Sequence, residues 1–365
     1  MKTDVKIREV AESDTEKAFS LHNETFHVSR SPKDWLWEYK ANHPECSVFL
    51  IAEAEGRIIG TQGMIPIPLN IRGKKGLTGK SENAFVDRSY RGRDLFQKMY
   101  DRAVTMCGER GMCCVWGLTR NKLVSKVLRD KFHFAVYEDV IQTYALTLRG
   151  GALPEVIQTK VRTRFATALV WSSYIYSLLC RYTFSGALNS SNIREGKDVV
   201  IENDARTEND LKQLYDRLRL KHDRLIHVEQ DSSYLTWRLV NNPSLQYTTY
   251  FLYERGMLKA YCYLNIKDEI AHITDFTCED RINGAILLKR VIHDLRKQRA
   301  RFVLFMGNPS NPLTSLTLAL IKRIGFLRLS ILQFSFVLKN ISCEVNISDL
   351  QDWYINGLWT EGYEW

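Results

Sequence analysis

The sequence lacks the patterns that mark several classes of protein. Its conspicuous uncharged run, residues 165–180, has sixteen residues, whereas a membrane-spanning helix needs about twenty. The first residues carry no apolar signal segment, so we expect a cytoplasmic protein. No block of like charge and no finger or RNA-binding signature is present, so we expect no nucleic-acid partner.

Cysteine is present without the spacing that metal sites use. The eight cysteines are residues 46, 107, 113, 114, 180, 262, 278 and 343. None forms a C-x-x-C pair or a metal-like spacing with histidine, so we expect no metal. They are too few for a disulfide scaffold and are interpreted as buried and reduced. Cys113 and Cys114 lie in an apolar run and are predicted to be strand residues without an activating neighbour.

What the chain does have is the composition of a globular protein with room for two domains. It contains 365 residues, of which 45% are hydrophobic and 25% are charged. Its formal net charge is +9. This excess of positive charge suits an anionic ligand, a nucleic acid or an anionic membrane surface, and it does not choose among them.

One stretch, residues 81–100, indicates a binding site for an anion. Residues 84–86 are a short apolar run, Tyr90-Arg91-Gly92-Arg93 is a basic turn, and residues 95–104 place apolar side chains at helical spacing. A strand that runs into a glycine-containing turn and a helix N-terminus presents unpaired N–H groups and the positive end of the helix dipole. Phosphate groups bind readily to such a turn.

The rest of the pattern predicts two copies of one α/β unit. The predicted strands of the first half are residues 5–10, 48–54, 57–66, 77–86, 112–118 and 134–148, with helices between them. Asp34-Trp35-Leu36-Trp37 is echoed by residues 233–237, and the strand, turn and strand at 48–66 are echoed at 247–266. A repeat of this size favours a tandem arrangement.

The turn at Tyr90-Arg91-Gly92-Arg93, with its strand and helix, resembles the GNAT superfamily of acyl-CoA-dependent N-acyltransferases. The resemblance covers residues 4–148, with a degenerate second copy at 200–338, and is nearest to tandem GNAT proteins of bacterial cell-surface polysaccharide clusters. It implies an α/β (α+β) fold with two mixed, mostly antiparallel sheets flanked by helices. The expected divisions are an N-terminal GNAT domain (1–150), a helical linker (151–197), a degenerate C-terminal domain (198–340) and a Trp-rich tail (341–365).

The resemblance also implies which residues hold acyl-CoA. The turn and the helix N-terminus would bind its diphosphate, and the exposed strand backbone would pair with its pantetheine amides. The residues expected to contact acyl-CoA are Phe85, Val86, Arg91, Gly92, Arg93, Asp94, Leu95, Phe96, Asn121 and Ser125. Asp94 departs from the family pattern, which has glycine there. Its carboxylate adds like-charge repulsion, so we expect weakened binding unless the side chain turns outward and caps the helix.

The chemistry requires a proton acceptor for the amine and a donor for the departing thiolate. Glu82, four residues before Val86, is the predicted general base, with a surface ion pair as the alternative. Lys80 shares its face of the strand and is predicted to bind an acidic acceptor. The usual GNAT tyrosine is replaced by Arg129, so Ser125 or water is the expected thiolate donor.

Two aromatic segments have alternative interpretations. Residues 165–180 are either a helix packed on protein or an interfacial helix that touches a membrane. Trp353, Trp359, Tyr363 and Trp365 either line the acceptor cleft, where aromatic faces bind sugar rings, or anchor the tail by ordinary burial.

The sequence thus predicts an acetyl-CoA-dependent N-acyltransferase without a metal. The expected acceptor is a small-molecule amine, foremost an amino sugar or nucleotide-linked sugar, which Lys80, Glu82 and Trp365 would contact. One alternative acceptor is an amino acid, peptide or small amine. The other alternative is a non-catalytic protein of the same fold that serves as a scaffold.

Overall fold

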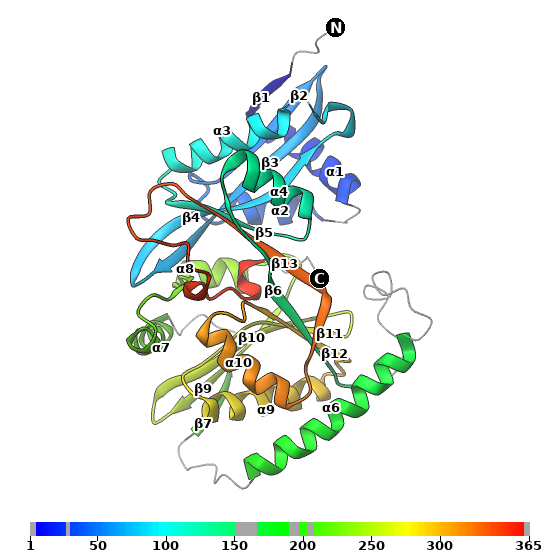
Figure 1. Ribbon diagram of the computed structural model, residues 1–365, viewed down its shortest axis with the longest axis vertical. Coiled ribbons are helices and arrows are strands. Elements are labelled where there is room, and N and C mark those ends of the chain that lie inside the picture. The colour runs from blue at the N-terminus through cyan, green and yellow to red at the C-terminus, as the bar shows by residue number, and fades with distance from the viewer. Residues whose placement is uncertain are drawn as a thin grey trace. The chain divides into compact units, whose positions relative to one another are not determined.

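The computed structural model describes residues 5–26, 30–92, 94–150, 166–189, 197–202 and 208–360. The chain divides into two compact units (Figure 1). Unit 1 comprises Met1–Glu138, Asn241–Ser244 and Ser335–Asp349. Unit 2 comprises Asp139–Val240, Leu245–Phe334 and Leu350–Trp365. The predicted fold class, mixed α/β with a tandem arrangement, is confirmed.

Unit 1 contains a six-stranded sheet in the order β1-β2-β3-β4-β5-β13. All its strand pairs are antiparallel except the parallel pair β4–β5. Its elements are β1 (Lys6–Glu9), α1 (Thr15–Phe26), α2 (Pro32–Lys40), β2 (Val48–Ala54), β3 (Arg57–Ile71), β4 (Lys74–Val86), α3 (Leu95–Glu109), β5 (Cys114–Thr119), α4 (Lys122–Phe132) and the last part of β13 (Leu327–Asn340).

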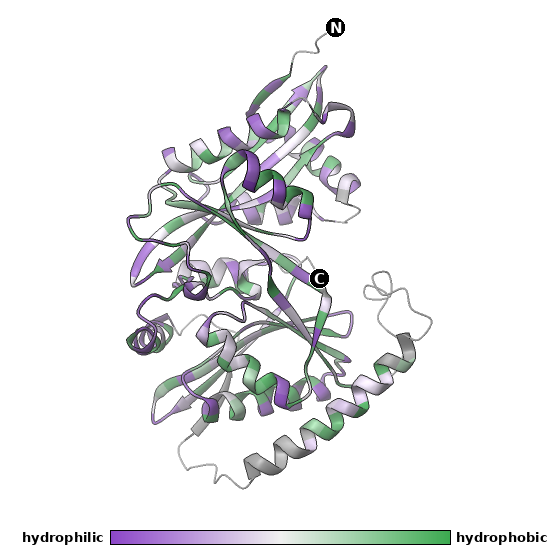
Figure 2. Cartoon of the chain, viewed as in Figure 1, coloured by the Kyte–Doolittle hydropathy of each residue, from purple (hydrophilic) through white to green (hydrophobic). Residues whose placement is uncertain are grey.

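Helix α3 packs on the sheet of unit 1, including β4, the strand that leads into the predicted binding turn. Met99, Tyr100, Ala103 and Cys107 recur at helical spacing and are buried against β2, β3 and β4. Figure 2 shows apolar residues along the strands and polar residues on the outer turns of the helices. The packing of this apolar face, rather than helix propensity, is what stabilises a helix of this length.

Unit 2 repeats the same order of elements. Its sheet runs β6-β12-β11-β10-β9-β7, with β11–β12 as its parallel pair. The elements are β6 (Ala135–Thr147), α6 (Ala166–Asn189), β7 (Lys197–Glu202), α7 (Glu208–Lys221), β8 (Ile226–Val228), α8 (Ser232–Leu235), β9 (Tyr247–Glu254), β10 (Met257–Lys267), β11 (Ile270–Cys278), α9 (Arg281–Lys297), β12 (Phe302–Gly307) and α10 (Pro312–Arg323).

The last strands of the two repeats are exchanged. From the order of the predicted strands, residues 134–148 are the last strand of the first copy and would complete its sheet, and the last strand of the second copy, residues 330–338, would complete the other. Instead β6 pairs through Gln142–Thr147 with β12 in unit 2, and β13 pairs through Ser335–Asn340 with β5 in unit 1. The units therefore do not follow the expected divisions at residues 150, 198 and 341. Both strands have the same apolar pattern, and this pattern cannot specify which of two equivalent strands is the neighbour.

The helix α6 covers part of the expected linker, and residues 151–165 and 190–196 lie outside the described residues. One side packs on unit 2, where Val170 is buried and Ser177 Oγ donates a hydrogen bond to the carbonyl oxygen of Thr147 at 2.6 Å. Trp171 and Leu179 are exposed. Among the described helices, none combines the length and apolar character that a bilayer crossing requires. Membrane contact by residues 165–180 stays a prediction.

A buried carboxylate in unit 2 makes the stability of the protein depend on pH. Asp275, on β11, is fully buried and accepts hydrogen bonds from Tyr261 (2.7 Å), Tyr354 (2.9 Å), Gln230 (3.1 Å) and Thr277 (3.1 Å). Burial nevertheless raises the pKa of Asp275 from 3.8 to about 6. Between these two values the folded protein binds more protons than the unfolded chain, so its stability falls as the pH rises.

We expect the Asp275→Asn variant to lose this pH dependence. The difference in free energy of unfolding, native protein minus variant, should decrease by roughly 2 kcal/mol between about pH 4 and about pH 7. Urea titrations across this range measure it. Asp223→Asn, an exposed position in unit 2, is the control. A constant difference for Asp275→Asn would show that the carboxyl group titrates normally.

Candidate functional site

The site strand β4 carries a bulge near its end. Thr61 pairs with Phe85 and Gly63 pairs with Glu82, so one residue of β3 faces both Asn83 and Ala84. Asn83 has a left-handed backbone with φ +54°. Its carbonyl oxygen accepts a hydrogen bond from Thr61 Oγ1 at 2.7 Å, and its Nδ2 donates to the Tyr39 hydroxyl at 2.7 Å. Bulges of this kind redirect a strand next to functional sites.

Beyond the start of the strand, β4 and β5 separate. Their parallel pairing consists of Gly79 with Val115 and Lys80 with Trp116. Both strands continue past this point, to Val86 and Thr119 respectively. Beyond Lys80 the described residues therefore show no strand pairing at the edge of β4 that would face β5, and an extended ligand can bind such an edge as a neighbouring strand would.

The turn after β4 presents the N-terminus of α3. The guanidinium of Arg91 folds back, and its Nε donates a hydrogen bond to the carbonyl oxygen of Val86 at 2.9 Å. Gly92 has φ +78° and open space around it. Asp94 directly precedes α3 and has φ +56°. Its left-handed backbone explains why glycine would be favoured at this position.

A cavity of about 570 Å³ lies between the end of β4, this turn and the start of α4. Its volume is within the usual range for small-molecule sites. The residues that line it are Thr25, Ala84, Phe85, Val86, Tyr90, Arg91, Gly92, Asp94, Leu95, Phe96, Gln97, Asn121, Leu123, Val124, Val127 and Lys131. The structure thus brings together the residues expected to contact acyl-CoA, except Ser125 and Arg93. Arg93 lies outside the described residues.

Asp94 turns outward and does not cap α3. Its side chain is 67% exposed and lies 3.7 Å from Lys131 Nζ. It accepts no hydrogen bond from the first turn of the helix. Of the alternative that Asp94 turns outward and caps the helix, the outward orientation is found and the capping is not, so Asp94 does not occupy the first-turn N–H groups.

Asn121 directly precedes α4 and Ser125 lies on it, and the two residues have different surroundings. Asn121 Oδ1 caps the helix by accepting hydrogen bonds from the backbone N–H groups of Leu123 and Val124, and the residue lines the cavity. Ser125 is buried at 2% exposure and does not line the cavity. Its hydroxyl has no hydrogen-bond partner in the described part of the chain.

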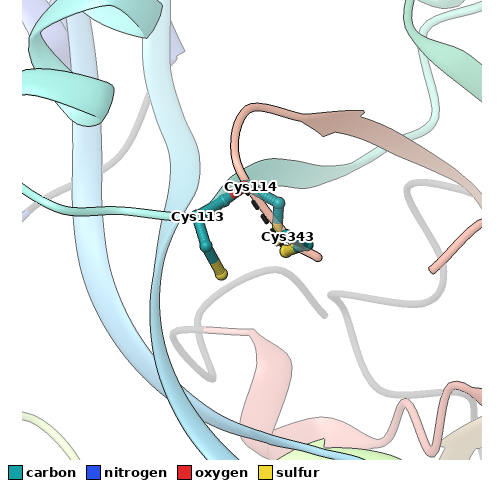
Figure 3. Close-up of side chains that lie close together, drawn as sticks. All are labelled: Cys113, Cys114 and Cys343. Atoms are coloured by element: carbon teal, nitrogen blue, oxygen red, sulfur yellow. Dashed lines mark hydrogen bonds between the residues drawn. The ribbon is translucent and has the colours of Figure 1, made fainter. Parts of the chain in front are cut away.

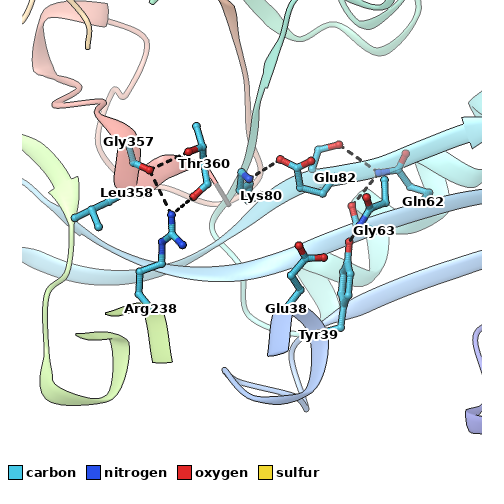
Figure 4. A network of polar contacts seen from close by, with 12 residues as sticks. Glu38, Tyr39, Gln62, Gly63, Lys80, Glu82, Arg238, Gly357, Leu358 and Thr360 are labelled. Carbon is cyan, nitrogen blue, oxygen red and sulfur yellow. Dashed lines mark hydrogen bonds and ion pairs between the residues drawn. The ribbon is translucent and has the colours of Figure 1, made fainter. Parts of the chain in front are cut away.

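Glu82 and Lys80 form an ion pair on the strand before the bulge (Figure 4). Lys80 Nζ lies 2.5 Å from Glu82 Oε1, and the two side chains are 4% and 14% exposed. Neither residue lines the cavity. The ion pair holds the Glu82 carboxylate in one orientation, and acceptor binding by Lys80 stays a prediction.

Several polar residues around Glu82 were not predicted. Tyr100 and Gln62 both donate hydrogen bonds to Ser81 Oγ, at 2.9 Å and 3.2 Å. Tyr39 is fully buried against Gly63, where a Cβ atom would lie 2.1 Å from the tyrosine hydroxyl. An asparagine inside a strand pattern, such as Asn83, was the sequence signal that could have indicated the bulge, because asparagine is depleted in strands.

In unit 2 the helix equivalent to α3 is α9, and an aspartate carboxylate caps its N-terminus. Asp280 precedes α9, and its Oδ1 accepts hydrogen bonds from the N–H groups of Ile282 (2.8 Å) and Asn283 (2.9 Å). All nine residues of β11 are buried. A phosphate would have to displace the carboxylate of Asp280, so this helix N-terminus is unsuited to an anion.

The tail does not present its described tryptophans to a cleft. Trp353 and Trp359 are each 1% exposed inside unit 2, with ring centroids 5.6 Å apart. The buried Arg238 donates hydrogen bonds to the carbonyl oxygens of Gly357 and Thr360 (Figure 4). Of the two interpretations of the tail, anchoring by burial therefore holds for Trp353 and Trp359, and lining of a cleft does not. Tyr363 and Trp365 lie outside the described residues.

Unit 1 thus combines a bulged site strand, a diverging parallel neighbour and a helix N-terminus that Asp94 does not cap. Residues 6–121 match the family model of the acetyltransferase (GNAT) domain, so the first third of the chain carries this domain. The prediction of a GNAT-type acetyltransferase is confirmed at this level. No curated protein matches the chain by sequence.

Solved structures share the fold over nearly the whole chain. One is a conserved protein of unknown function from Enterococcus faecalis V583, described as a probable N-acyltransferase (10% identity, 93% of this chain and 72% of that chain, TM-score 0.59). Others are a tandem GNAT protein from the clavulanic acid biosynthesis pathway (10%, 92% and 98%, 0.55) and Saccharomyces cerevisiae N-myristoyltransferase with bound myristoyl-CoA (11%, 97% and 89%, 0.56). At these identities the likeness shows the fold.

We expect replacement of Asp94 by glycine to tighten the binding of acetyl-CoA. The change removes a negative charge, frees Lys131 and relieves a left-handed aspartate. The Kd should fall about threefold, corresponding to the roughly 0.7 kcal/mol that one charge is worth at a helix N-terminus. Isothermal titration measures it.

Two further variants separate charge from backbone strain. Asp94→Asn removes the charge and keeps a side chain at the left-handed position, so it should retain most of the gain in affinity. Asp101→Asn, an exposed acid on α3, is the matched control and should leave the Kd unchanged. An unchanged or weaker affinity in Asp94→Gly would show that Asp94 does not weaken the binding of acetyl-CoA.

Proposed function

We propose that this chain is an acyl-CoA-dependent N-acyltransferase that moves an acetyl group to the amino group of an amino sugar or nucleotide-linked sugar. The observation that carries the proposal is the cavity at the uncapped N-terminus of α3, beside the unpaired edge of β4. An uncapped helix N-terminus suits a diphosphate, and an unpaired strand edge suits the amides of pantetheine. The acetyl group follows from the description of the matched family as acetyltransferases.

Different residues of unit 1, along β4 and the turn that follows it, would bind acyl-CoA and accept the proton of the amine. Acyl-CoA supplies the acyl group as a thioester. Arg91, Lys131 and the first-turn N–H groups of α3 hold its phosphates, and the backbone of Phe85 and Val86 holds its amide groups. Glu82 takes a proton from the acceptor amine, directly or through water, so that the nitrogen lone pair can attack the acyl carbon.

The thiolate that leaves must receive a proton. The tyrosine expected of a GNAT enzyme is replaced by Arg129, whose guanidinium is bound by Glu138 at 2.8 Å. The buried hydroxyl of Ser125 is the candidate donor on α4, and water is the alternative. No covalent bond to the protein is needed, because the amine attacks the thioester directly.

A second cavity favours an acceptor that carries a phosphate. It has a volume of about 990 Å³ and shares Thr25, Phe85 and Arg91 with the first. Its wall also includes Lys17, Arg57 and Arg88 beside the acids Glu16, Glu24 and Asp87. Cations bind a phosphate and acids attract an ammonium group, as a phosphorylated amino sugar presents. We include in this proposal that the amino sugar acceptor comes from the synthesis of bacterial cell-surface polysaccharides.

We expect acetyl-CoA to raise the melting temperature by a few degrees at concentrations well above its Kd. Released thiol should then identify the acceptor in a screen of amino sugars, nucleotide-linked amino sugars, amino acids, peptides and small amines. If only an amino acid, peptide or small amine is acetylated, the proposed sugar acceptor is wrong and the alternative acceptor takes its place. No thermal shift at millimolar acetyl-CoA, with no turnover, would favour the non-catalytic scaffold.

We expect Glu82→Gln to lower kcat by about a hundredfold to ten-thousandfold, the usual contribution of a general base. The Kd of acetyl-CoA should not change, because Glu82 lies outside the cavity. Glu55→Gln, in the exposed turn between β2 and β3, is the control. If Glu82→Gln keeps the kcat and the pH profile of the native protein, Glu82 is not the general base and serves only as the ion-pair partner of Lys80.

A further inference from the structure

Three cysteine sulfurs meet in unit 1 at a place that the proposed reaction does not use (Figure 3). Cys113 directly precedes β5, Cys114 begins it, and Cys343 follows the end of β13. Their sulfur atoms all lie within 4.8 Å of one another. The expectation that Cys113 and Cys114 have no activating neighbour is therefore wrong, because the exchange of β13 brings a third thiol to them from the far end of the chain.

Backbone hydrogen bonds hold the two segments together. The carbonyl oxygen of Cys113 accepts the N–H groups of Ile341 and Ser342, both at 2.9 Å, and the thiol of Cys343 at 3.4 Å. Asn340 Oδ1 accepts the N–H of Cys343 at 2.8 Å and turns the chain back toward β5. The thiols are thus brought together by a built turn that follows a paired strand.

The three thiols differ in access and acidity. Cys114 is fully buried, whereas Cys113 and Cys343 are half-buried. Hydrogen bonds from Cys114 and Cys343 lower the pKa of the Cys113 thiol. The contact with Cys113 raises the pKa of both Cys114 and Cys343. A thiolate with a thiol beside it is the arrangement of a redox-active cysteine pair.

We propose that Cys113 and Cys343 form a reversible disulfide that ties the exchanged strand β13 to β5. The site lies at the opposite end of β4 from the cavity, since the N–H of Cys113 is bonded to the carbonyl oxygen of Leu77 at 2.8 Å. The proposal therefore does not depend on acyl transfer.

The oxidant is a low-molecular-weight disulfide such as oxidised glutathione. The Cys113 thiolate attacks one sulfur of this disulfide, the S–S bond breaks, and one glutathione leaves as a thiolate. Cys343 then loses its proton to solvent and attacks the Cys113 sulfur, which releases the second glutathione thiolate. Two protein thiols are oxidised by two electrons, and one oxidised glutathione is reduced to two thiols.

A metal ion fits the cluster less well. Metal binding would require all three sulfurs as thiolates, including Cys114, which is fully buried and whose pKa is raised well above its ordinary value. Among the described residues, no fourth histidine, cysteine, aspartate or glutamate side chain joins this cluster. Structural zinc takes four protein ligands.

The disulfide would join residues that are 230 positions apart in the chain. Cross-links that close long loops restrict the unfolded chain most. The cross-link would also fix the turn that follows β13 to the residue that precedes β5, so the redox state would control how firmly the exchanged strand is held.

The test is mass spectrometry of the full chain equilibrated with oxidised glutathione, alkylated and digested with trypsin without reduction. Trypsin should release residues 111–120 and 340–365 as separate peptides. We expect these peptides to be joined, with fragmentation placing the bond at Cys113 and Cys343, and to separate after treatment with dithiothreitol. Cys113→Ser and Cys343→Ser should each abolish the joined peptide.

Cys46→Ser, at another half-buried cysteine of unit 1, is the control and should keep the cross-link. Circular dichroism of each variant checks that it is folded. The joined peptide in the native protein tests the proposal even where a variant does not fold. Separate peptides, a glutathione adduct as the end product, or a bond at Cys114 would overturn the proposal. So would zinc or copper bound to the reduced protein, with the three thiols protected from alkylation until a chelator is added.

Discussion

The candidate site depends on one constraint, the separation of β4 from β5 after only two paired residues. At Gly79 and Lys80 the strand pairs with both β3 and β5, and beyond Lys80 the described residues show no further pairing with β5. A buried edge without partners is costly, so such an edge persists where water or a ligand can bind it. The bulge at Asn83 and Ala84 then directs the end of the strand into the turn that begins α3. The cavity and the helix N-terminus are consequences of this divergence.

The divergence is accompanied by local backbone strain that the rest of unit 1 stabilises. Asn83, Gly92 and Asp94 all have left-handed backbones within twelve positions, and only Gly92 adopts this conformation without steric cost. The strain is held from both sides. Tyr39 and Thr61 bind Asn83, and the buried face of α3 anchors the helix that follows Asp94. Strained residues that cluster in this way are typical of sites where a ligand is bound.

Much of this arrangement could be predicted from the sequence, and the missing parts share a physical cause. Strand and helix periodicity placed β4, the turn and α3, because apolar spacing reports which face is buried. The same spacing could not show that β6 and β13 exchange places, since either strand satisfies the apolar pattern of either sheet. Contacts between distant residues, such as Cys343 beside Cys113, follow from pairing register, which the pattern of one chain leaves open.

The two repeats show how one carboxylate can open or close an anion site. Asp94 and Asp280 occupy the same place, directly before the helix that follows the site strand. Asp280 has an extended backbone, with φ −154°, which lets its carboxylate reach back to the N–H groups of α9. Asp94 has a left-handed backbone that points its carboxylate toward Lys131, away from α3. A negative charge near the site of a phosphate lowers affinity in both cases, but only Asp280 also occupies the donors. The backbone conformation, rather than the residue type, therefore decides whether the aspartate occupies the N–H groups at the start of the helix.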